Sequence, residues 1–193
     1  MLSEGDSISV FWGGNHTGIF AASRSRLNFK GLAVGGSGLN NLEARAPAEL
    51  QQQPKVLTVL IGANDLVGYA SAQAFVTRLF AYTAPFKAAG TKIAIGTILP
   101  QQVPSQPANN VLHNTRRAQA NTLIRAAVGN QIDAVIDFGA DPVMGVDTAP
   151  NDRTLYSDGL HPTEGCGIGC GGQGKLAAIY KAAVDALLLT IGI

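Results

Sequence analysis

The sequence predicts an α/β protein whose mainly parallel sheet is covered by helices on both faces. Strand-like and helix-like segments alternate along the chain, as in a parallel sheet with helical crossovers. Two segments, Lys55–Ile61 and Lys92–Leu99, are short and nearly continuous apolar runs, which are typical of strands buried on both faces. With 193 residues and 46% hydrophobic side chains, the chain can bury a sizeable core, and we expect a single domain over residues 1–193.

Each element is expected from a local signal. The expected strands are Met1–Glu4, which is unusually short, Leu27–Val34, Lys55–Ile61, Lys92–Leu99 and Ala134–Phe138. The expected helices are Asn41–Gln52, Ser71–Ala89, Val111–Val128 and Lys175–Leu189. Gly90 and Gly129 stand directly after two of these helices, where glycine commonly forms the C-terminal cap.

Charge and hydropathy exclude several classes of partner. Fourteen Lys and Arg against 13 Asp and Glu give a net charge of +1, so we expect neither nucleic-acid binding nor attraction to an anionic membrane. We expect no transmembrane segment, because the longest apolar candidate, Leu176–Ile193, is interrupted by Lys181 and Asp185. The opening residues Met1–Glu4 lack the apolar run of a signal peptide, so none is expected.

Candidate functional residues follow the expected strands. Ser7 follows the first strand, Gly36 the second and Asn64 the third, and a long loop with Asp158 and His161 follows the last strand. Parallel sheets bind ligands at the carboxyl ends of their strands, so we expect these residues to meet at one edge.

These residue types are the parts of a serine hydrolase site. Ser7 needs a base to become a nucleophile, and His161 is the candidate base. Asp158 lies close enough in sequence to hold the imidazole through its Nδ1–H. The backbone N–H groups of Gly36 and Ser7 and the side-chain amide of Asn64 are candidate donors to an oxyanion. A helix starting just after Ser7 would further stabilise negative charge there.

The motifs resemble the four signature blocks of the SGNH/GDSL hydrolases. Gly5-Asp6-Ser7, the glycine turn around Gly36, the run Gly62-Ala63-Asn64-Asp65 and the run Asp158-Gly159-Leu160-His161-Pro162 occur in the family's order. The resemblance implies a flavodoxin-like three-layer α/β/α fold and hydrolysis of esters or thioesters through an acyl-serine. It assigns Ser7 as nucleophile, His161 as base, Asp158 as its orienting carboxylate, and Gly36 and Asn64 as oxyanion donors.

The chain departs from the family pattern in two places. The family usually carries an asparagine at the start of the second block, where this chain has Gly31. The segment Thr163–Gly174 is inserted between the His161 motif and the last helix, and we expect it to lie beside His161 and shape the substrate cleft.

Several polar residues have structural interpretations. We expect Asp6 and Asp65 to brace loops through hydrogen bonds instead of touching substrate. We expect His113 to lie on a solvated helix face and His16 to lie in an exposed loop. Trp12 either stacks on a substrate group or packs in the core.

Cys166 and Cys170 allow three interpretations. They form a disulfide, they join His161 in an incomplete zinc site, or they are free thiols. A disulfide would indicate an oxidising compartment, and secretion or a periplasmic location is then the natural expectation.

The sequence therefore predicts a carboxylic ester hydrolase that acts on a small-molecule ester and needs no metal or cofactor. Short acyl esters, such as an acetylated carbohydrate, suit a rim rich in Gly, Asn and Gln. Two alternatives remain, a longer-chain lipase, thioesterase or lysophospholipase using apolar residues near Trp12, and a binding module that has lost catalysis.

Overall fold

A five-stranded parallel sheet forms the centre of the computed structural model, which describes residues 1–193. Its strands are β1 (Leu2–Gly5), β2 (Lys30–Gly31), β3 (Val56–Leu60), β4 (Lys92–Gly96) and β5 (Ala134–Ile136). They lie in the order β2-β1-β3-β4-β5, and each neighbouring pair is parallel. This is the flavodoxin-like order, and its switch point between β1 and β3 is where such sheets place ligand sites. The predicted parallel sheet is confirmed.

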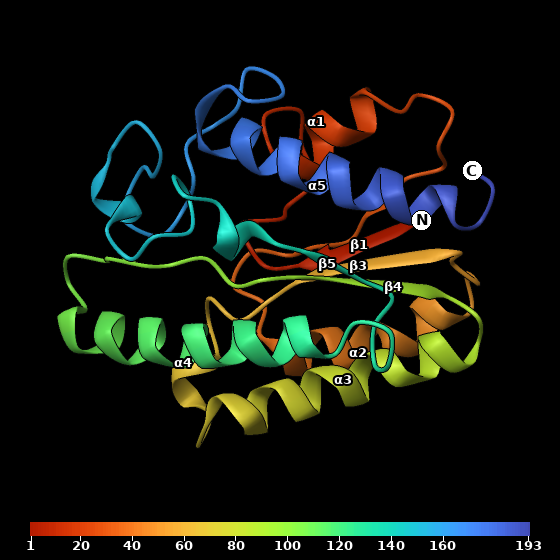
Figure 1. Ribbon diagram of the computed structural model, residues 1–193, viewed down its shortest axis with the longest axis horizontal. Coiled ribbons are helices and arrows are strands. Elements are labelled where there is room, and N and C mark those ends of the chain that lie inside the picture. Colours follow the sequence, from red (N-terminus) through yellow and green to blue (C-terminus); the bar gives the residue numbers. More distant parts are fainter.

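Helices cover both faces of the sheet (Figure 1). The helices α1 (His16–Ala22) and α5 (Gly171–Leu189) lie on one face, while α2 (Leu39–Leu50), α3 (Ala72–Ala88) and α4 (Pro107–Ala126) lie on the other. Short 3-10 turns at Leu66–Gly68, Phe138–Ala140 and Ala149–Asn151 lie in the connecting loops. The predicted three-layer α/β/α arrangement is confirmed.

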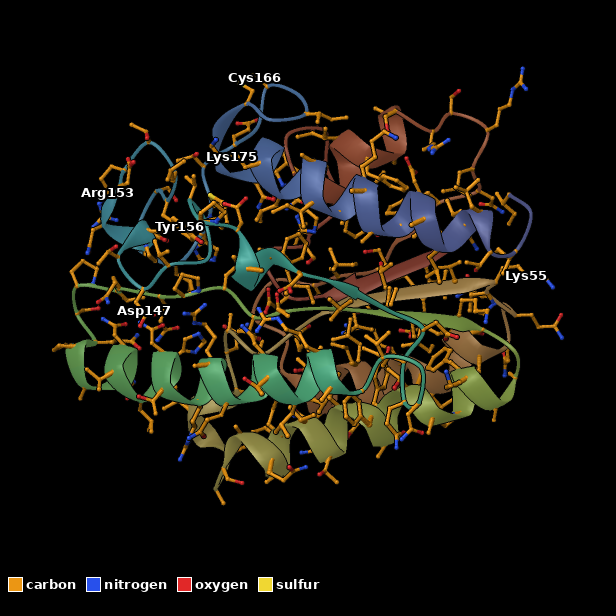
Figure 2. The ribbon with its side chains drawn as sticks, in the orientation of Figure 1. Lys55, Asp147, Arg153, Tyr156, Cys166 and Lys175 are labelled. Atoms are coloured by element: carbon orange, nitrogen blue, oxygen red, sulfur yellow. A yellow bond between two sulfur atoms is a disulfide. The ribbon has the colours of Figure 1, made fainter.

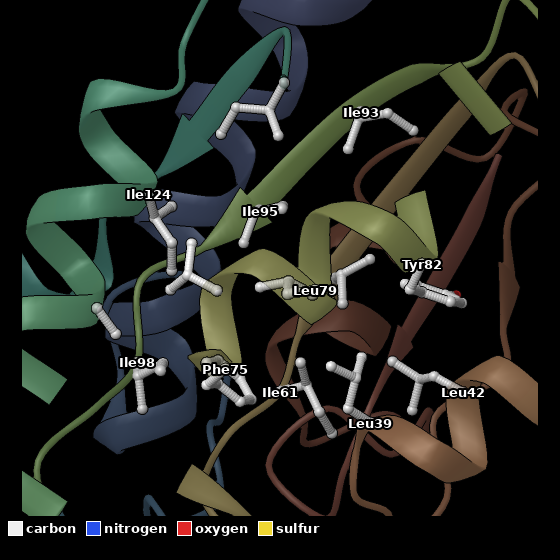
Figure 3. Packing of buried hydrophobic residues seen from close by; sticks show 14 of the residues in the cluster. Leu39, Leu42, Ile61, Phe75, Leu79, Tyr82, Ile93, Ile95, Ile98 and Ile124 are labelled. Atoms are coloured by element: carbon white, nitrogen blue, oxygen red, sulfur yellow. The ribbon is translucent and has the colours of Figure 1, made fainter. Parts of the chain in front are cut away.

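Each face of the sheet buries its own hydrophobic cluster. On the α2–α4 side, Phe75 and Leu79 of α3 belong to one buried cluster with Ile93 and Ile95 of β4 (Figure 3). On the other side, Phe20 of α1 belongs to a second buried cluster that includes residues of α5. All residues of β3 are buried because both clusters cover it, which explains why its sequence lacks the alternation of a half-exposed strand.

Two charged residues of the last helix take part in ion pairs. Lys181 and Asp185 form an ion pair one turn apart, and Asp185 also pairs with Arg24 at the end of α1. No helix of the protein has both the length and the apolar character needed to span a bilayer.

Two elements differ most from the sequence expectation. The strand expected at Leu27–Val34 is reduced to Lys30–Gly31, which pairs only with β1 at the sheet edge. The helix His16–Ala22 was not expected, because its seven residues are too few to establish a periodic pattern. Its N-terminus is fixed by Asn15, whose side chain accepts the Thr17 N–H.

The helix α5 starts four residues earlier than expected, in a glycine-rich stretch. Low helix propensity argues against Gly172 and Gly174 in a helix. A Cβ on Gly172 would lie 2.1 Å from the Leu155 carbonyl oxygen, and one on Gly174 would lie 2.2 Å from the Gly167 carbonyl oxygen. Close packing of the preceding loop on the first turn of α5 therefore accounts for both glycines.

Candidate active site

Ser7 lies in a tight turn immediately after β1. The turn is closed by the Ser9 N–H, which donates to the Asp6 carbonyl oxygen at 3.0 Å, and the Asp6 carboxylate accepts the Ile8 N–H at 3.0 Å. The next helix begins only at His16, so no helix N-terminus stabilises negative charge directly after Ser7.

Ser7, His161 and Asp158 form a continuous hydrogen-bonded chain. The Ser7 Oγ lies 2.9 Å from His161 Nε2, and His161 Nδ1 lies 2.7 Å from Asp158 Oδ2. Residues 154 positions apart in sequence are thus within proton-transfer distance, as the strand topology predicts.

Asp158 is held in its ionised form. Partial burial opposes ionisation, but the backbone N–H groups of His161 and Leu160 and the His161 ring outweigh it and hold the pKa of Asp158 below its ordinary value. A carboxylate accepts hydrogen bonds only, so the proton of the neutral imidazole must lie on Nδ1. The Nε2 lone pair of His161 therefore points at the Ser7 hydroxyl.

The loop of Asp158 and His161 is fixed to the segment after β4. The Gln102 N–H donates to the Gly159 carbonyl oxygen at 2.7 Å. Gly159 has φ of +90°, and a Cβ there would lie 2.2 Å from the Gln102 carbonyl oxygen. Only glycine satisfies both restrictions, so this residue sets the position of the loop.

The other two motif segments lie against the Ser7 turn. A Cβ built on Gly35 would lie 3.9 Å from the Ser7 Cβ, which places the exposed Gly35-Gly36 backbone beside the nucleophile candidate. The Asn64 side chain donates from Nδ2 to the Ser37 carbonyl oxygen at 3.0 Å. That bond uses one amide hydrogen of Asn64 and leaves the second available to a ligand.

Asp65 braces the loops around Asn64, as expected. Its Oδ2 accepts the Leu39 N–H at 2.5 Å and so ties the loop after β3 to the first turn of α2. Asp6 also acts within the loops, through its bond to Ile8. Burial raises the pKa of Asp6 to about 7, although the Ile8 N–H favours its ionised form. Both carboxylates thus have internal hydrogen bonds, which supports the bracing role.

His16 helps to connect the segment after Ser7 with α5, through the side chain of Gln173. Contrary to expectation it is buried, and its Nδ1 lies 2.8 Å from Gln173 Oε1 while Gln173 Nε2 donates to the Ile8 carbonyl oxygen at 3.1 Å. Burial lowers the pKa of His16 to about 4, so its imidazole is neutral. Gln173 lies 157 positions away, and no sequence signal links it to His16.

The solvated position expected for His113 is also wrong. His113 is fully buried in α4, and its Nε2 lies 3.1 Å from the Leu99 carbonyl oxygen. Arg117, one turn later, is buried too and donates to the Gly145 carbonyl oxygen at 3.0 Å. Loops after β4 and β5 cover this polar helix face, and nothing in the helix sequence predicts that cover.

Cys166 and Cys170 form a disulfide, with their Cα atoms 5.4 Å apart. Figure 2 shows Cys166 in the loop that precedes α5. The inserted segment begins directly after the His161-Pro162 step, and the Gly165 N–H donates to the Gly14 carbonyl oxygen at 2.8 Å. Of the three interpretations of these cysteines, the structure shows the disulfide, and the segment joins the loop after Ser7 to the loop that carries His161.

Aromatic residues after the Ser7 turn are partly exposed. Trp12 is 47% exposed, so the core alternative for it is wrong. Phe11 covers Gly31, where a Cβ would lie 2.2 Å from the Phe11 Cβ, and its ring lies 5.3 Å from that of Phe29. An asparagine at position 31 would therefore collide with Phe11.

Comparison with known proteins shows which family the chain resembles. A model of the GDSL-like lipase/acylhydrolase family matches residues 5–165, which include all four motif segments. The chain belongs to this family. A comparison with curated proteins found no match.

Solved structures of the GDSL-like family share the fold. A GDSL-like lipase from Bacteroides thetaiotaomicron superposes with a TM-score of 0.74 at 19% identity, over 98% of this chain and 87% of that one. The psychrotrophic esterase EstA from a Pseudoalteromonas species gives 0.66 at 17% identity, over 97% of each chain. A catalytic mutant of an acetylxylan esterase from Geobacillus stearothermophilus gives 0.60 at 16% identity, over 100% and 93%. This GDSL-like chain thus has the family's α/β fold.

Proposed function

We propose that this GDSL-like chain is a serine esterase that hydrolyses carboxylic esters through an acyl-serine intermediate. The observation that carries the proposal is the chain of hydrogen bonds from Ser7 Oγ to His161 Nε2, 2.9 Å, and from His161 Nδ1 to Asp158 Oδ2, 2.7 Å. A hydroxyl becomes a useful nucleophile when a correctly oriented base removes its proton during attack.

In the first half-reaction, the Ser7 oxygen attacks the ester carbonyl carbon while His161 Nε2 takes the hydroxyl proton. The carbonyl π bond opens and places negative charge on the carbonyl oxygen. When the tetrahedral intermediate collapses, the bond to the alcohol breaks and His161 returns the proton to that alcohol. Water then attacks the acyl-serine by the reverse sequence, which releases the acid and restores Ser7.

Three donors are proposed to stabilise the oxyanion, namely the backbone N–H groups of Ser7 and Gly36 and the free amide hydrogen of Asn64. The exposed glycine backbone beside Ser7 leaves room for the carbonyl oxygen. The bond from Asn64 to Ser37 fixes the amide plane, so its second hydrogen is already oriented before substrate arrives.

A short acyl group, such as acetyl, is the proposed acid part of the substrate. Of the apolar residues that could hold a long chain, Ile19 and Phe20 of α1 are buried. Phe11 and Trp12 remain about half exposed. Two of the residues on which the longer-chain lipase or thioesterase alternative relies are therefore largely inaccessible to a substrate.

Ser7→Ala is the decisive variant, tested with p-nitrophenyl acetate and with a fluorophosphonate label. We expect the wild-type chain to turn over the ester and to be labelled once, and the variant to do neither while unfolding at the same temperature. An unlabelled, inactive wild-type chain would instead support the alternative of a silent binding module. Comparing p-nitrophenyl acetate with p-nitrophenyl octanoate separates the short-chain from the long-chain esterase.

A further inference from the structure

A cleft of about 310 Å³ opens beside the proposed catalytic residues. Its walls include Asn64 from the loop after β3, and Asp158 and Leu160 from the loop that carries His161. The segment between β4 and α4 completes it with Gln101, Gln106 and Asn109. Because Asp158 and Asn64 lie in its wall, a molecule in this cleft lies next to the reacting ester.

Side-chain amides dominate the polar lining of this cleft, which we name the amide cleft. Four of its residues carry one, namely Asn64, Gln101, Gln106 and Asn109. A side-chain amide has both hydrogen-bond donors and an acceptor, as a hydroxyl group does. Several amides in one cleft can therefore hydrogen-bond to a ligand with several hydroxyls. The aliphatic residues between them, such as Val67 and Val103, offer contacts to C–H groups.

The amides of the cleft keep unused hydrogen-bonding capacity. The backbone of Gln101 is held on both sides by Asn114, which accepts its N–H at 3.1 Å and donates to its carbonyl oxygen at 3.0 Å. The Gln101 side-chain amide forms no hydrogen bond within the protein, although the residue is 4% exposed. Gln106 Oε1 accepts from Asn109 Nδ2 at 3.3 Å, which leaves the Gln106 NH₂ and the Asn109 oxygen free.

We propose that the amide cleft binds the alcohol part of the substrate and that this part is a sugar, so that the ester is an acetylated mono- or oligosaccharide. This inference rests on the proposed esterase function. An acyl chain in the cleft would displace water from the amides without replacing its hydrogen bonds, which is unfavourable. The cleft volume lies at the small end of ligand sites, about 300–1,000 Å³, and so suits a small sugar.

The position of the cleft agrees with the chemistry of the leaving group. His161 must protonate the departing alcohol, so the alcohol lies on the His161 side of the ester carbonyl. Two lining residues of the amide cleft, Asp158 and Leu160, lie just before His161 in sequence. A sugar bound there presents its ester oxygen toward Nε2, while the acetyl group remains near Gly36.

The test uses the double variant Gln106→Leu/Asn109→Leu, because both side chains are exposed and can be replaced without disturbing the core. The control is Gln119→Leu, an exposed glutamine of α4 outside the cleft. The substrates are 6-O-acetylglucose, which brings hydroxyls, and p-nitrophenyl acetate, which brings none.

We expect kcat/KM for 6-O-acetylglucose to fall at least tenfold in the double variant, mainly through KM. kcat/KM for p-nitrophenyl acetate, whose leaving alcohol enters the same cleft without a further hydroxyl, should fall much less than kcat/KM for 6-O-acetylglucose, and Gln119→Leu should change neither value. Equal losses on both substrates, or no loss on either, overturn the sugar assignment. A gain on p-nitrophenyl octanoate that p-nitrophenyl acetate does not share would show instead that the cleft holds an acyl chain.

The same experiment separates this inference from the proposed function. If p-nitrophenyl acetate turnover depends on Ser7 but the cleft variants do not discriminate between substrates, only the sugar assignment fails. If Ser7→Ala retains wild-type turnover, the proposed esterase mechanism itself fails.

Discussion

Asp158 holds His161 in two ways at once. Its Oδ2 lies 2.7 Å from His161 Nδ1, while its Oδ1 accepts the backbone N–H of the same residue at 2.8 Å. One carboxylate therefore fixes both the ring and the peptide that carries it, although the side chain of Asp158 is 54% exposed.

Asp158→Asn should preserve the loop that carries His161 but prevent His161 from acting as a base. The asparagine oxygen can still accept backbone N–H groups, but its NH₂ facing Nδ1 favours the imidazole tautomer with the proton on Nε2, which cannot accept from Ser7. We expect kcat to fall by up to about 10⁴-fold. Steady-state kinetics on p-nitrophenyl acetate measures this, with the melting temperature as a control for folding. A loss of less than tenfold would argue against an orienting role for Asp158.

Asn64→Ala should reduce kcat by roughly 10²–10³-fold with little change in KM, because an oxyanion donor acts mainly in the transition state. The control is Asn40→Ala, an exposed asparagine in the first turn of α2, which should leave kcat unchanged. A decrease of only a few-fold for Asn64→Ala would remove its amide from the proposed oxyanion site.

Because of Asp6, the free energy of unfolding should decrease as pH rises. Burial raises its pKa from 3.8 to about 7 in the folded chain, so between these values the folded state holds a proton that the unfolded state has lost. The free energy of unfolding therefore decreases with pH across this window, by at most roughly 1.4 kcal/mol per pH unit.

Asp6→Asn removes this contribution, and urea unfolding at pH 5 and pH 8 tests it. Burial also raises the pKa of Glu49, to about 8, but that residue is present in both proteins and cancels in the comparison. We expect the free energy of unfolding of the variant, measured relative to wild type, to be higher at pH 8 than at pH 5. If this difference between variant and wild type is the same at both pH values, Asp6 titrates in its ordinary range.

Reduction of the Cys166–Cys170 disulfide should cost about 2 kcal/mol, since it closes a short loop. In a chain of this size that corresponds to a decrease in melting temperature of roughly 4–8 °C. Differential scanning calorimetry with and without a reductant measures the shift. Cys166→Ala/Cys170→Ala should melt at the temperature of the reduced wild type and should not respond to the reductant. A response in that variant would show that the reductant acts elsewhere.

Arg45 should be far more important to stability than other surface arginines. It donates to both oxygens of Glu4, at 3.0 and 2.6 Å, and the Glu4 side chain is fully buried. Arg45→Gln leaves that carboxylate without its partner, which should cost about 3–5 kcal/mol.

Arg78→Gln is the matched control for Arg45. Arg78 pairs with Glu43 at the surface, where an ion pair contributes about 0–1 kcal/mol. Chemical denaturation compares the two variants, and adding Glu4→Gln to Arg45→Gln should recover part of the loss. Equal effects of the two arginine variants would contradict the importance assigned to the buried partner.

The sequence predicts those parts of the fold that carry a strong local pattern. Continuous apolar runs predict β3 and β4, and the cap at Gly90 predicts the end of α3, and each element lies within a few residues of its expected bounds. The helix α1 and the edge strand β2 are too short for such a pattern. Their positions depend on contacts with distant segments, such as the pairing of Leu2 with Lys30.

The candidate site was predictable for a different reason. Ser7, Asn64 and His161 each follow a strand, and parallel strands bring their carboxyl ends to one edge whatever the length of the loops. The burial of His16 and His113 could not be foreseen, because their partners Gln173 and Leu99 come from other elements. Local polarity suggests exposure, and only tertiary packing reverses it.

The contact between Phe11 and Gly31 restricts which residues position 31 can hold. A side chain at position 31 would meet Phe11 at its Cβ, an atom that every residue except glycine carries. Mutational libraries that randomise position 31 should therefore return only glycine, even in clones where Phe11 is shortened to alanine. The restriction comes from how closely the two backbones approach, and the aromatic ring adds to it.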